Sequence, residues 1–317
     1  MRAVVFEEHG DRDVLQVQEK PVPEPGPGEV LVLVEASGVN FIDVYQRTGT
    51  YQMRLPSALG SEGAGTVLSY GAGVEGLSPG DRVAWTGILG SHAEQAVVPA
   101  ERLVPVPEGI STEQAAAAML QGLTAHYLTH DSYPVRAGDT VLVHAAAGGV
   151  GRLLTRIVTH LGGRVVATAG TPAKREIALA DGAVRAVAYD QALQAVKEVS
   201  EGVAAAYDGV GKDTFDISLA ALRPRGAMVL FGAASGKVPP FDPLRLMAGS
   251  YTLTRPTLGH FIAKRHELLE RADTLFGWMA DGVVTVDVSG KYGLDAVQDA
   301  YADLEGRRST GKLLVIP

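Results

Sequence analysis

The stretch from residue 140 to residue 154 limits the possible folds of this chain more than any other. It opens with an apolar run, residues 141–143, that has the length and β-branching of a buried parallel strand. A turn of small residues follows at 145–151, and then a helical pattern that continues to Leu161. This order predicts the opening of a dinucleotide-binding βαβ unit, because glycines let a pyrophosphate approach the backbone at a helix N-terminus.

The glycine pattern departs from the usual G-x-G-x-x-G. Residues 147–151 read AGGVG, with Ala147 where the first glycine usually stands. A second short β-branched strand at 164–169 follows the helix directly and supports the interpretation. Residues 71–76 satisfy G-x-G-x-x-G literally, but Pro79 follows and no helix, so we interpret that segment as a surface turn.

Strands and helices alternate between residues 121 and 260. The helix at 172–181 has Thr171 as a capping residue and Pro172 in its first turn. Such alternation predicts a Rossmann-like, doubly wound parallel sheet of the α/β class. Residues 208–211 (DGVG) follow a strand at the edge where such sheets bind ligands. The candidate strands are 140–144, 164–169, 184–188, 203–207 and 227–231.

The length of 317 residues favours two domains. Residues 1–120 form short strands separated by glycine and proline, and predict a β-rich, partly closed barrel as the catalytic domain. Residues 121–260 form the nucleotide domain. Residues 261–317 return to the first domain, and are expected to form a helix at 266–281, a strand at 283–288, a helix at 295–304 and a strand at 312–316.

Composition excludes several classes of function. The chain has no cysteine, which rules out disulfides, thiol catalysis, iron–sulfur clusters and cysteine-bound zinc. A net charge of −8 argues against nucleic acid as a partner. No apolar run approaches the roughly 20 residues of a membrane-spanning helix, and the first residues do not read as a secretory leader. We therefore expect a cytoplasmic protein without a membrane partner.

Several motifs together resemble one family. The chain is similar to the medium-chain dehydrogenase/reductase superfamily, and within it to the zinc-independent quinone oxidoreductases of the ζ-crystallin-like branch. The resemblance implies a GroES-like partly closed barrel beside the Rossmann-like sheet. The motifs are residues 38–43 (GVNFID), 59–65 (LGSEGAG), 122–125 (GLTA), 144–151 (HAAAGGVG), 207–211 (YDGVG), 231–235 (FGAAS) and 254–256 (TRP).

The resemblance also implies that no metal takes part. Zinc-dependent relatives place a cysteine near position 40 and a His-Glu pair near 61–62. Here these places hold Asn40, Ser61 and Glu62. The eight histidines show no ligand spacing on an expected helix.

The expected cofactor is NADPH. An NAD-specific fold carries an acid at the end of its second strand, whereas here Lys174 and Arg175 follow that strand. A cation there can pair with the 2′-phosphate; the alternative is a solvated helix face. The resemblance adds Tyr189 beside the phosphate. The remaining expected cofactor residues are Thr124, Gly148, Gly149, Val150, Gly151, Gly170, Phe231, Ala233, Ser235, Arg307 and Lys312; for the last two, a solvated loop is the alternative.

Four residues are candidates for the catalytic side: Asn40, Tyr45, Tyr51 and Arg255. Aromatic rings can stack on a flat acceptor, and hydroxyl or amide donors can stabilise a developing oxyanion. Each also has a structural alternative: ordinary packing for Tyr51, and a link between domains for Arg255. Asp43 fits a helix-start residue better than a direct role.

These features together predict an NADPH-dependent reductase of quinones or related conjugated carbonyls. Two alternatives remain open: a 2-alkenal or enone reductase on the same scaffold, and a low-turnover NADPH-binding protein with an RNA-binding or structural role. The resemblance further implies a homodimer, joined through the strand near residues 251–254.

Overall fold

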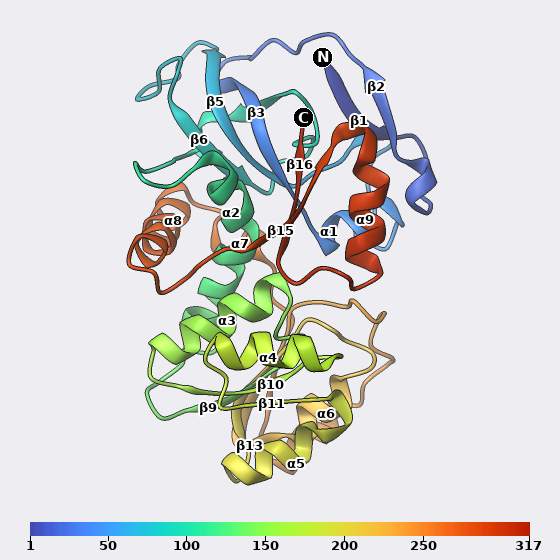
Figure 1. Cartoon of the computed structure of the whole chain (residues 1–317), viewed down its shortest axis with the longest axis vertical. Helices are drawn as coiled ribbons and strands as arrows, with labels where there is room; N and C mark the ends of the chain where they lie inside the picture. The colour runs from blue at the N-terminus through green and yellow to red at the C-terminus, as the bar shows by residue number, and fades with distance from the viewer. The chain divides into compact units, whose positions relative to one another are not determined.

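The computed structural model describes residues 1–317, and the chain divides into two compact units (Figure 1). Unit 1 contains residues 1–120, 262–280 and 286–317. Unit 2 contains residues 121–261 and 281–285. Their boundaries follow from the packing of the chain, because each unit has its own sheets and its own apolar core.

Unit 2 is built on a six-stranded sheet in which every pair of neighbouring strands is parallel. The strand order reverses at β9, which lies between β10 and β12. This arrangement confirms the predicted doubly wound sheet. The strands in spatial order are β11 (Arg185–Val187), β10 (Arg164–Thr168), β9 (Thr140–Val143), β12 (Val203–Asp208), β13 (Leu222–Leu230) and β14 (Thr252–Thr254).

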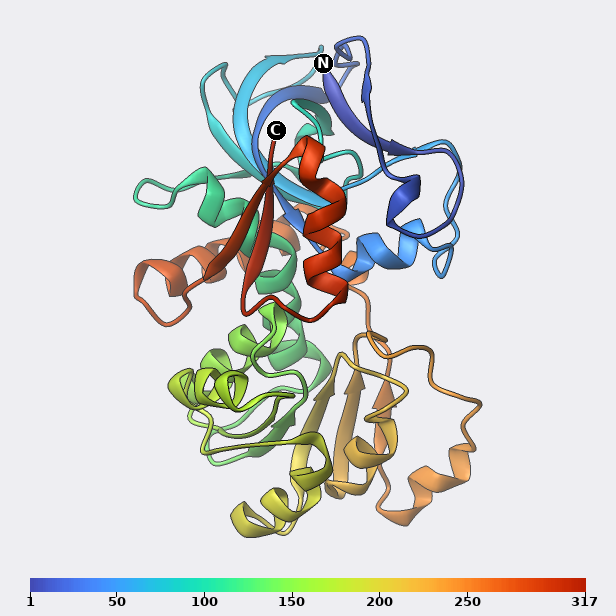
Figure 2. The same ribbon diagram turned by 45° about the vertical axis from the view of Figure 1, so that its right-hand side comes forward.

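Helices cover both faces of this sheet. In Figure 1, α3 (Gly149–His160) and α4 (Pro172–Ala180) lie on one side of β10 and β11, and α5 (Ala192–Val199) lies on the other. Strand side chains such as Leu142 and Met228 pack in one buried cluster with α5 and α6 (Phe215–Ala220). The short helices η4 (Tyr189–Gln191), η5 (Pro243–Ala248) and α7 (Leu258–Phe261) complete unit 2, and Figure 2 shows strands β12 to β14 side by side.

The start of α4 agrees with its sequence. Thr171 caps the helix by accepting a hydrogen bond from the Lys174 backbone N–H at 3.3 Å, and Pro172 occupies the first turn. The cap fixes the direction of the first helical turn, which carries Lys174. Helix α2 (Thr112–Tyr127) begins in unit 1 and ends in unit 2, and its last turn continues as a π-helix over Leu128–Ser132.

Unit 1 contains a bent, mixed seven-stranded sheet and a three-stranded sheet. The long strand β3 (Glu29–Val39) pairs with three others, and bulges at Val32 and Ala36 let it bend between them. The ladders do not close into a ring, in agreement with a partly closed barrel. The larger sheet runs β15 (Val288–Gly293), β16 (Lys312–Ile316), β3, β5 (Glu62–Tyr70), β6 (Arg82–Thr86) and β8 (Val104–Pro105), with β7 (Gln95–Pro99) on β3; the smaller runs β2 (Gln16–Glu19), β1 (Arg2–Phe6) and β4 (Ser57–Ala58).

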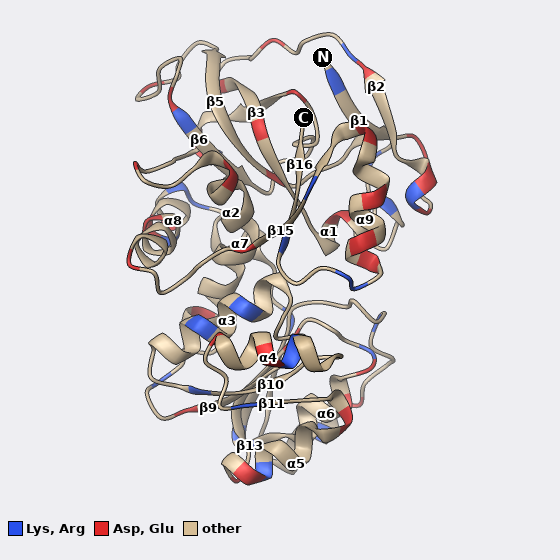
Figure 3. Cartoon of the chain, viewed as in Figure 1, with Lys and Arg blue, Asp and Glu red and all other residues tan.

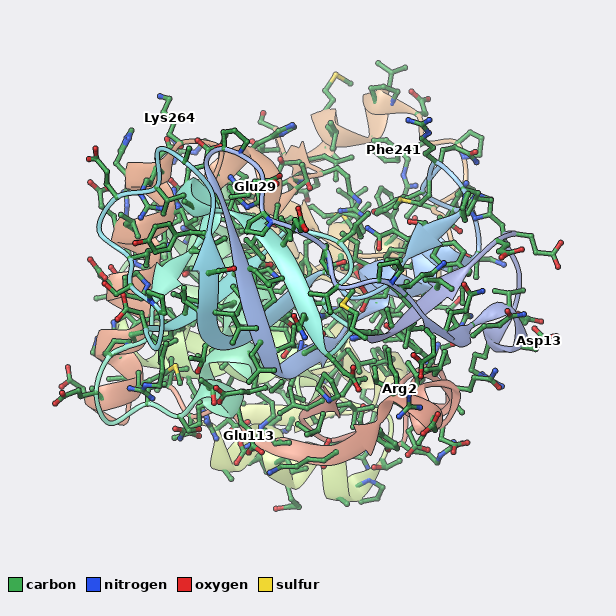
Figure 4. All side chains as sticks on the ribbon, turned by 90° about the horizontal axis from the view of Figure 1, so that it is seen from above. Arg2, Asp13, Glu29, Glu113, Phe241 and Lys264 are labelled. Carbon is green, nitrogen blue, oxygen red and sulfur yellow. The ribbon has the colours of Figure 1, made fainter.

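Three further helices belong to unit 1: α1 (Phe41–Arg47), α8 (Arg265–Ala280) and α9 (Val297–Glu305). Helix α9 packs Val297, Ala300 and Tyr301 into an apolar cluster with β1 and β16. Seen from above, the strands of unit 1 cross the centre of the view, while Asp13 and Lys264 lie at its edge (Figure 4). None of the helices combines the length and the apolar character that a membrane-spanning segment requires. Basic and acidic residues are interspersed along the chain (Figure 3).

Two details of the sequence interpretation have clear outcomes. Residues 71–76 form a surface turn, as predicted, with Gly73 and Gly76 at φ of 80° and 74°. The predicted strand at 283–288 is wrong, since β15 starts only at Val288. The segment with the alternating valines packs against unit 2 without forming a strand. Val284 is buried there, and the Arg156 guanidinium donates to the Thr285 carbonyl at 2.6 Å.

Candidate active site

The glycine turn after β9 brings backbone closely against backbone. A Cβ on Gly151 would lie 2.4 Å from the carbonyl oxygen of Ala145 and 2.8 Å from the Cα of Ala146, so only glycine fits there. Ala145 itself adopts a φ of 50°, and Gly148 caps the 12-residue helix α3. The result is a helix whose first N–H groups face the turn at the carboxyl end of β9, which is the geometry that receives a pyrophosphate.

The ends of β10 and β11 carry the residues expected at the 2′-phosphate. Residues 168–175 contain no acid. Lys174 lies in the first turn of α4, half-buried, and Gly170 is exposed with open space around it. Tyr189 follows β11, and its ring lies 5.9 Å from the His144 ring. Because β10 and β11 are parallel neighbours, Gly170, Lys174 and Tyr189 share one edge of the sheet.

Two loops meet at the same edge of the sheet. The loop after β13 contains Phe231, Ala233 and Ser235. The Ser235 N–H donates to the carbonyl of Val210 at 2.8 Å, joining the loop after β13 to the loop after β12. The buried carboxylate of Asp208 holds this second loop. It accepts hydrogen bonds from the N–H groups of Val210 and Gly211 at 2.9 Å and from the hydroxyls of Thr214 and Ser218 at 2.8 Å. The acid noted in the sequence at position 208 therefore shapes the loop.

The remaining predicted residues lie in several places. Thr124 is buried in α2. Arg255 follows β14, is exposed, and donates to the Pro256 carbonyl at 3.4 Å. Arg307 follows α9 in unit 1, is exposed, and has a φ of 55°. The structure thus gathers the glycine turn, Gly170, Lys174, Tyr189, Phe231, Ala233, Ser235 and Arg255 at the carboxyl edge of the unit 2 sheet, whereas Asn40, Tyr45, Tyr51, Arg307 and Lys312 belong to unit 1.

Helix α1 and the following loop carry three aromatic rings. The Tyr45 and Tyr51 ring centroids are 5.2 Å apart, and those of Phe41 and Tyr45 are 6.3 Å apart. The Tyr51 N–H donates to the Tyr45 carbonyl at 2.8 Å, which fixes the loop against the helix. Tyr45 is half-buried and Tyr51 is exposed, so this pair of rings lies at the surface of unit 1.

Asn40 begins α1 and is held on every side. Its backbone N–H donates to Asp43 Oδ2 at 2.9 Å. Its Nδ2 donates to Glu62 Oε1 at 2.7 Å and to the Gly38 carbonyl at 3.2 Å, while its Oδ1 accepts from Lys312 Nζ at 2.7 Å. Both hydrogens of the amide are therefore engaged, and Asn40 presents an acceptor instead of the donor that an oxyanion needs.

The comparisons with known proteins cover both units of the chain. Two family models match, an alcohol dehydrogenase GroES-like domain over residues 26–108 and a zinc-binding dehydrogenase domain over residues 149–274. A quinone oxidoreductase of Pseudomonas aeruginosa is 40% identical over 100% of this chain and 99% of its own length. The chain belongs to the medium-chain dehydrogenase/reductase superfamily.

Within this superfamily the chain groups with the zinc-independent quinone oxidoreductases. The crystal structure of Escherichia coli quinone oxidoreductase complexed with NADPH superposes with a TM-score of 0.97 at 39% identity, covering 100% of both chains. A 2-haloacrylate reductase of a Burkholderia species is 35% identical over 99% of this chain and 98% of its own length.

Where zinc-dependent members of the superfamily hold their metal, this chain holds a buried ion pair. The Lys312 ammonium, fully buried, donates to Glu62 Oε1 and to Asn40. A Cβ on Gly38 would lie 2.1 Å from Glu62 Oε1 and 2.7 Å from Lys312 Cε, so glycine is required beside the pair. Lys312 is predicted to contact the cofactor from the carboxyl segment, with a solvated loop as the alternative. The structure confirms its strand, β16, but buries the ammonium inside unit 1.

A second acid lies next to this pair. Asp43 is fully buried, accepts a hydrogen bond from the Ser61 hydroxyl at 2.7 Å, and lies 3.0 Å from the Tyr301 hydroxyl. Burial raises the pKa of Asp43 to about 6, although its hydrogen bonds and Lys312 act against this. Burial also lowers the pKa of His92, which lies against Tyr301, to about 3.

Sequence reasoning missed several members of this cluster: Ser37, His92 and Tyr301. His92 and Tyr301 are 209 positions apart, and no local pattern links them. Asp43 was interpreted as a helix-start residue, and its hydrogen bond with the Asn40 backbone agrees with that role. The sequence marks Glu62 as a motif residue at the place of the His-Glu pair of zinc-dependent relatives, but not as half of an ion pair, because its partners come from three separate segments.

Proposed function

We propose that this chain is an NADPH-dependent reductase that transfers a hydride to a quinone or a related conjugated carbonyl. One observation carries the cofactor choice: the strand that would present an acid to a ribose hydroxyl presents Gly170, and Lys174 stands in the next helical turn. The full-length similarity to quinone oxidoreductases, one of them solved with NADPH, supports the same function.

The residues of unit 2 fit the parts of this cofactor. When bound, NADPH supplies the hydride. The N–H groups at the start of α3 and the helix dipole would hold its pyrophosphate, since the glycines leave no side chain in the way. Lys174 and Tyr189 would hold the 2′-phosphate through a charge-assisted hydrogen bond and a hydroxyl donor. The loop of Phe231, Ala233 and Ser235 would border the nicotinamide.

The residues of unit 1 would serve the acceptor. The rings of Tyr45 and Tyr51 give a flat quinone a surface on which to stack. Reduction leaves negative charge on the acceptor oxygen, and the tyrosine hydroxyls are the donors that unit 1 offers for it. Asn40 is not a donor for this charge, because its amide hydrogens are already bonded to Glu62 and Gly38.

A second acceptor class also has support. The 35% identity with a 2-haloacrylate reductase favours electron-poor alkenes as alternative substrates on the same scaffold. The deciding experiment measures consumption of NADPH and of NADH by the purified chain with quinones, 2-alkenals, 2-haloacrylates and nitroaromatics. We expect the highest kcat/KM with NADPH and a quinone. Turnover restricted to alkenes would replace the quinone proposal with the second one, and no turnover with any acceptor would contradict both.

We also propose that two copies of the chain pair through β14. This strand is the last of the unit 2 sheet, so one of its edges carries no partner strand. Leu244 and Met247 on the preceding helix η5 are 70% and 78% exposed, which is unusual for large apolar side chains. Light scattering after gel filtration tests the proposal: a dimer is expected, and Leu244→Asp with Met247→Asp should give a monomer. A parent chain that is already monomeric would contradict it.

A further inference from the structure

Six residues of unit 1 form a closed ring of hydrogen bonds around the start of α1. Each contact is between 2.7 and 3.0 Å, and the residues come from β3, α1, β5, α9 and the loop before β7. We call it the Asn40 ring. In order it contains Asn40, Asp43, Tyr301, His92, Ser37 and Glu62, and it closes from the Glu62 side chain back to the Asn40 amide.

Four of these contacts lie in a row, and each needs one hydrogen. They join Asp43 to Tyr301, Tyr301 to His92, His92 to Ser37, and Ser37 to the backbone carbonyl of Glu62. Tyr301 and Ser37 each supply one hydrogen, and a neutral imidazole supplies one. The carbonyl supplies none. The row is therefore complete only when Asp43 is protonated and donates the fourth hydrogen to Tyr301.

The charges around Asp43 lead to the same conclusion. Lys312 is paired with Glu62, and Arg47 is paired with Glu305 at 3.0 Å while its guanidinium lies 5.9 Å from the Tyr301 ring centroid. Asp43 has hydrogen-bond donors but no cation bonded to it, and it is completely buried. A buried carboxyl without a paired cation favours its neutral form. His92 does not supply the extra proton, because burial lowers its pKa to about 3.

We propose that the Asn40 ring binds one proton on Asp43, and that Tyr301 and His92 are positioning residues through which this proton holds Asn40 and α1 in place. The functional part of the proposal rests on the reductase activity proposed above. With the proton bound, His92 carries its hydrogen on Nδ1, donates to Ser37 and accepts from Tyr301. Ser37 then donates to the Glu62 carbonyl, next to the side chain that orients Asn40.

Loss of the proton reverses the row. Tyr301 then donates to the Asp43 carboxylate, and His92 carries its hydrogen on Nε2 and donates to Tyr301. Ser37 donates to the free Nδ1, and the Glu62 carbonyl loses its hydrogen bond from Ser37. His92 therefore changes tautomer while it stays neutral, and this change distinguishes the proposal from an ordinary histidine titration.

The test is ¹⁵N NMR of the full chain with ¹⁵N-labelled histidine side chains. Spectra are recorded from about pH 4.5 to about pH 8.5, a range that spans the raised pKa of Asp43. His92→Gln assigns the resonances. We expect Nδ1 of His92 to change from a protonated to an unprotonated nitrogen as the pH rises through about 6, and Nε2 to change in the opposite sense. In Asp43→Asn, which stays neutral and keeps a donor, His92 should keep its hydrogen on Nδ1 at every pH.

Two controls keep the result specific. His144 is buried in unit 2 and bonded to Thr168 through Nδ1, so its tautomer should not respond to Asp43→Asn. Tyr301→Phe breaks the row and should uncouple His92 from Asp43. A His92 that keeps one tautomer throughout the pH range, or a tautomer change that persists in Asp43→Asn, would overturn the proton assignment.

The positioning role has its own readout. For the parent chain, kcat/KM for the acceptor should fall about three- to tenfold as the pH rises through about 6, the effect of losing one hydrogen bond that supports Glu62. Asp43→Asn should lack this inflexion. Equal pH profiles in the two proteins would overturn the positioning role even where the tautomer change is observed. Absence of any reductase activity would instead overturn the proposed function, and the NMR result would still decide the proton.

Discussion

The ammonium of Lys312 donates to Oδ1 of Asn40 at 2.7 Å, and the two residues are 272 positions apart in the chain. This bond joins the closing strand β16 to the start of α1 inside one unit. It also fixes the orientation of the Asn40 amide, because Oδ1 must face the cation and Nδ2 must face Glu62. A buried charge thus determines what Asn40 can offer to a ligand.

Removing the charge should therefore cost stability. Lys312→Met leaves the Glu62 carboxylate buried without its cation, and we expect a loss of about 3–5 kcal/mol in the free energy of unfolding. Urea denaturation measures it. The matched control is Lys291→Met, which breaks the exposed pair with Glu113 and should cost about 1 kcal/mol or less. Equal losses of unfolding free energy in the two variants would show that the buried pair stabilises the fold no more than the exposed pair does.

The close approach at Gly151 gives a second prediction. Gly151→Ala places a Cβ 2.4 Å from the Ala145 carbonyl oxygen, so the turn or the helix must move. We expect a lower melting temperature and weaker NADPH binding, because the first N–H groups of α3 lose their alignment. Gly277→Ala is the control, since that helical glycine is exposed and has open space. It should stabilise the chain by about 0.5–1 kcal/mol.

Asp43 makes stability depend on pH in an unusual direction. Its pKa is raised from 3.8 to about 6 in the folded chain, so between these values the folded state holds a proton that the unfolded state has lost. Stability from this group is full below about 3.8 and is lost as the pH rises to about 6, by about 3 kcal/mol in total. The measurement is the difference in unfolding free energy between the parent and Asp43→Asn. It should fall over that window and stay constant above it, and a difference that rises with pH would contradict the assignment.

Much of the fold was predictable because its signals are local. The apolar run before Ala145, the glycines after it and the cap at Thr171 each indicate a structure within a few residues, and all three are observed. The strand predicted at 283–288 failed because the alternating valines do not reveal that the Arg156 side chain binds the backbone at Thr285.

The candidate site was less predictable, because its interior is assembled from distant segments. Asn40 was selected from the sequence, but the engagement of its amide depends on Lys312, Glu62 and Gly38. His92 and Tyr301 have no pattern around them that marks a buried polar residue. Lys312 is a candidate through the family resemblance, and a sequence does not show that a lysine points into the core.

Cofactor preference tests the central claim most directly. The affinities of the parent chain and of Lys174→Ala for NADPH and NADH are measured by quenching of intrinsic fluorescence, with Lys197→Ala on the exposed side of α5 as the charge-matched control. A charge-assisted contact with the 2′-phosphate is worth roughly 1.5–3 kcal/mol, so Lys174→Ala should weaken NADPH about ten- to a hundredfold and leave NADH nearly unchanged. Lys197→Ala should change neither. An equal loss for both cofactors in Lys174→Ala, or a parent chain that binds NADH as tightly as NADPH, would contradict the account.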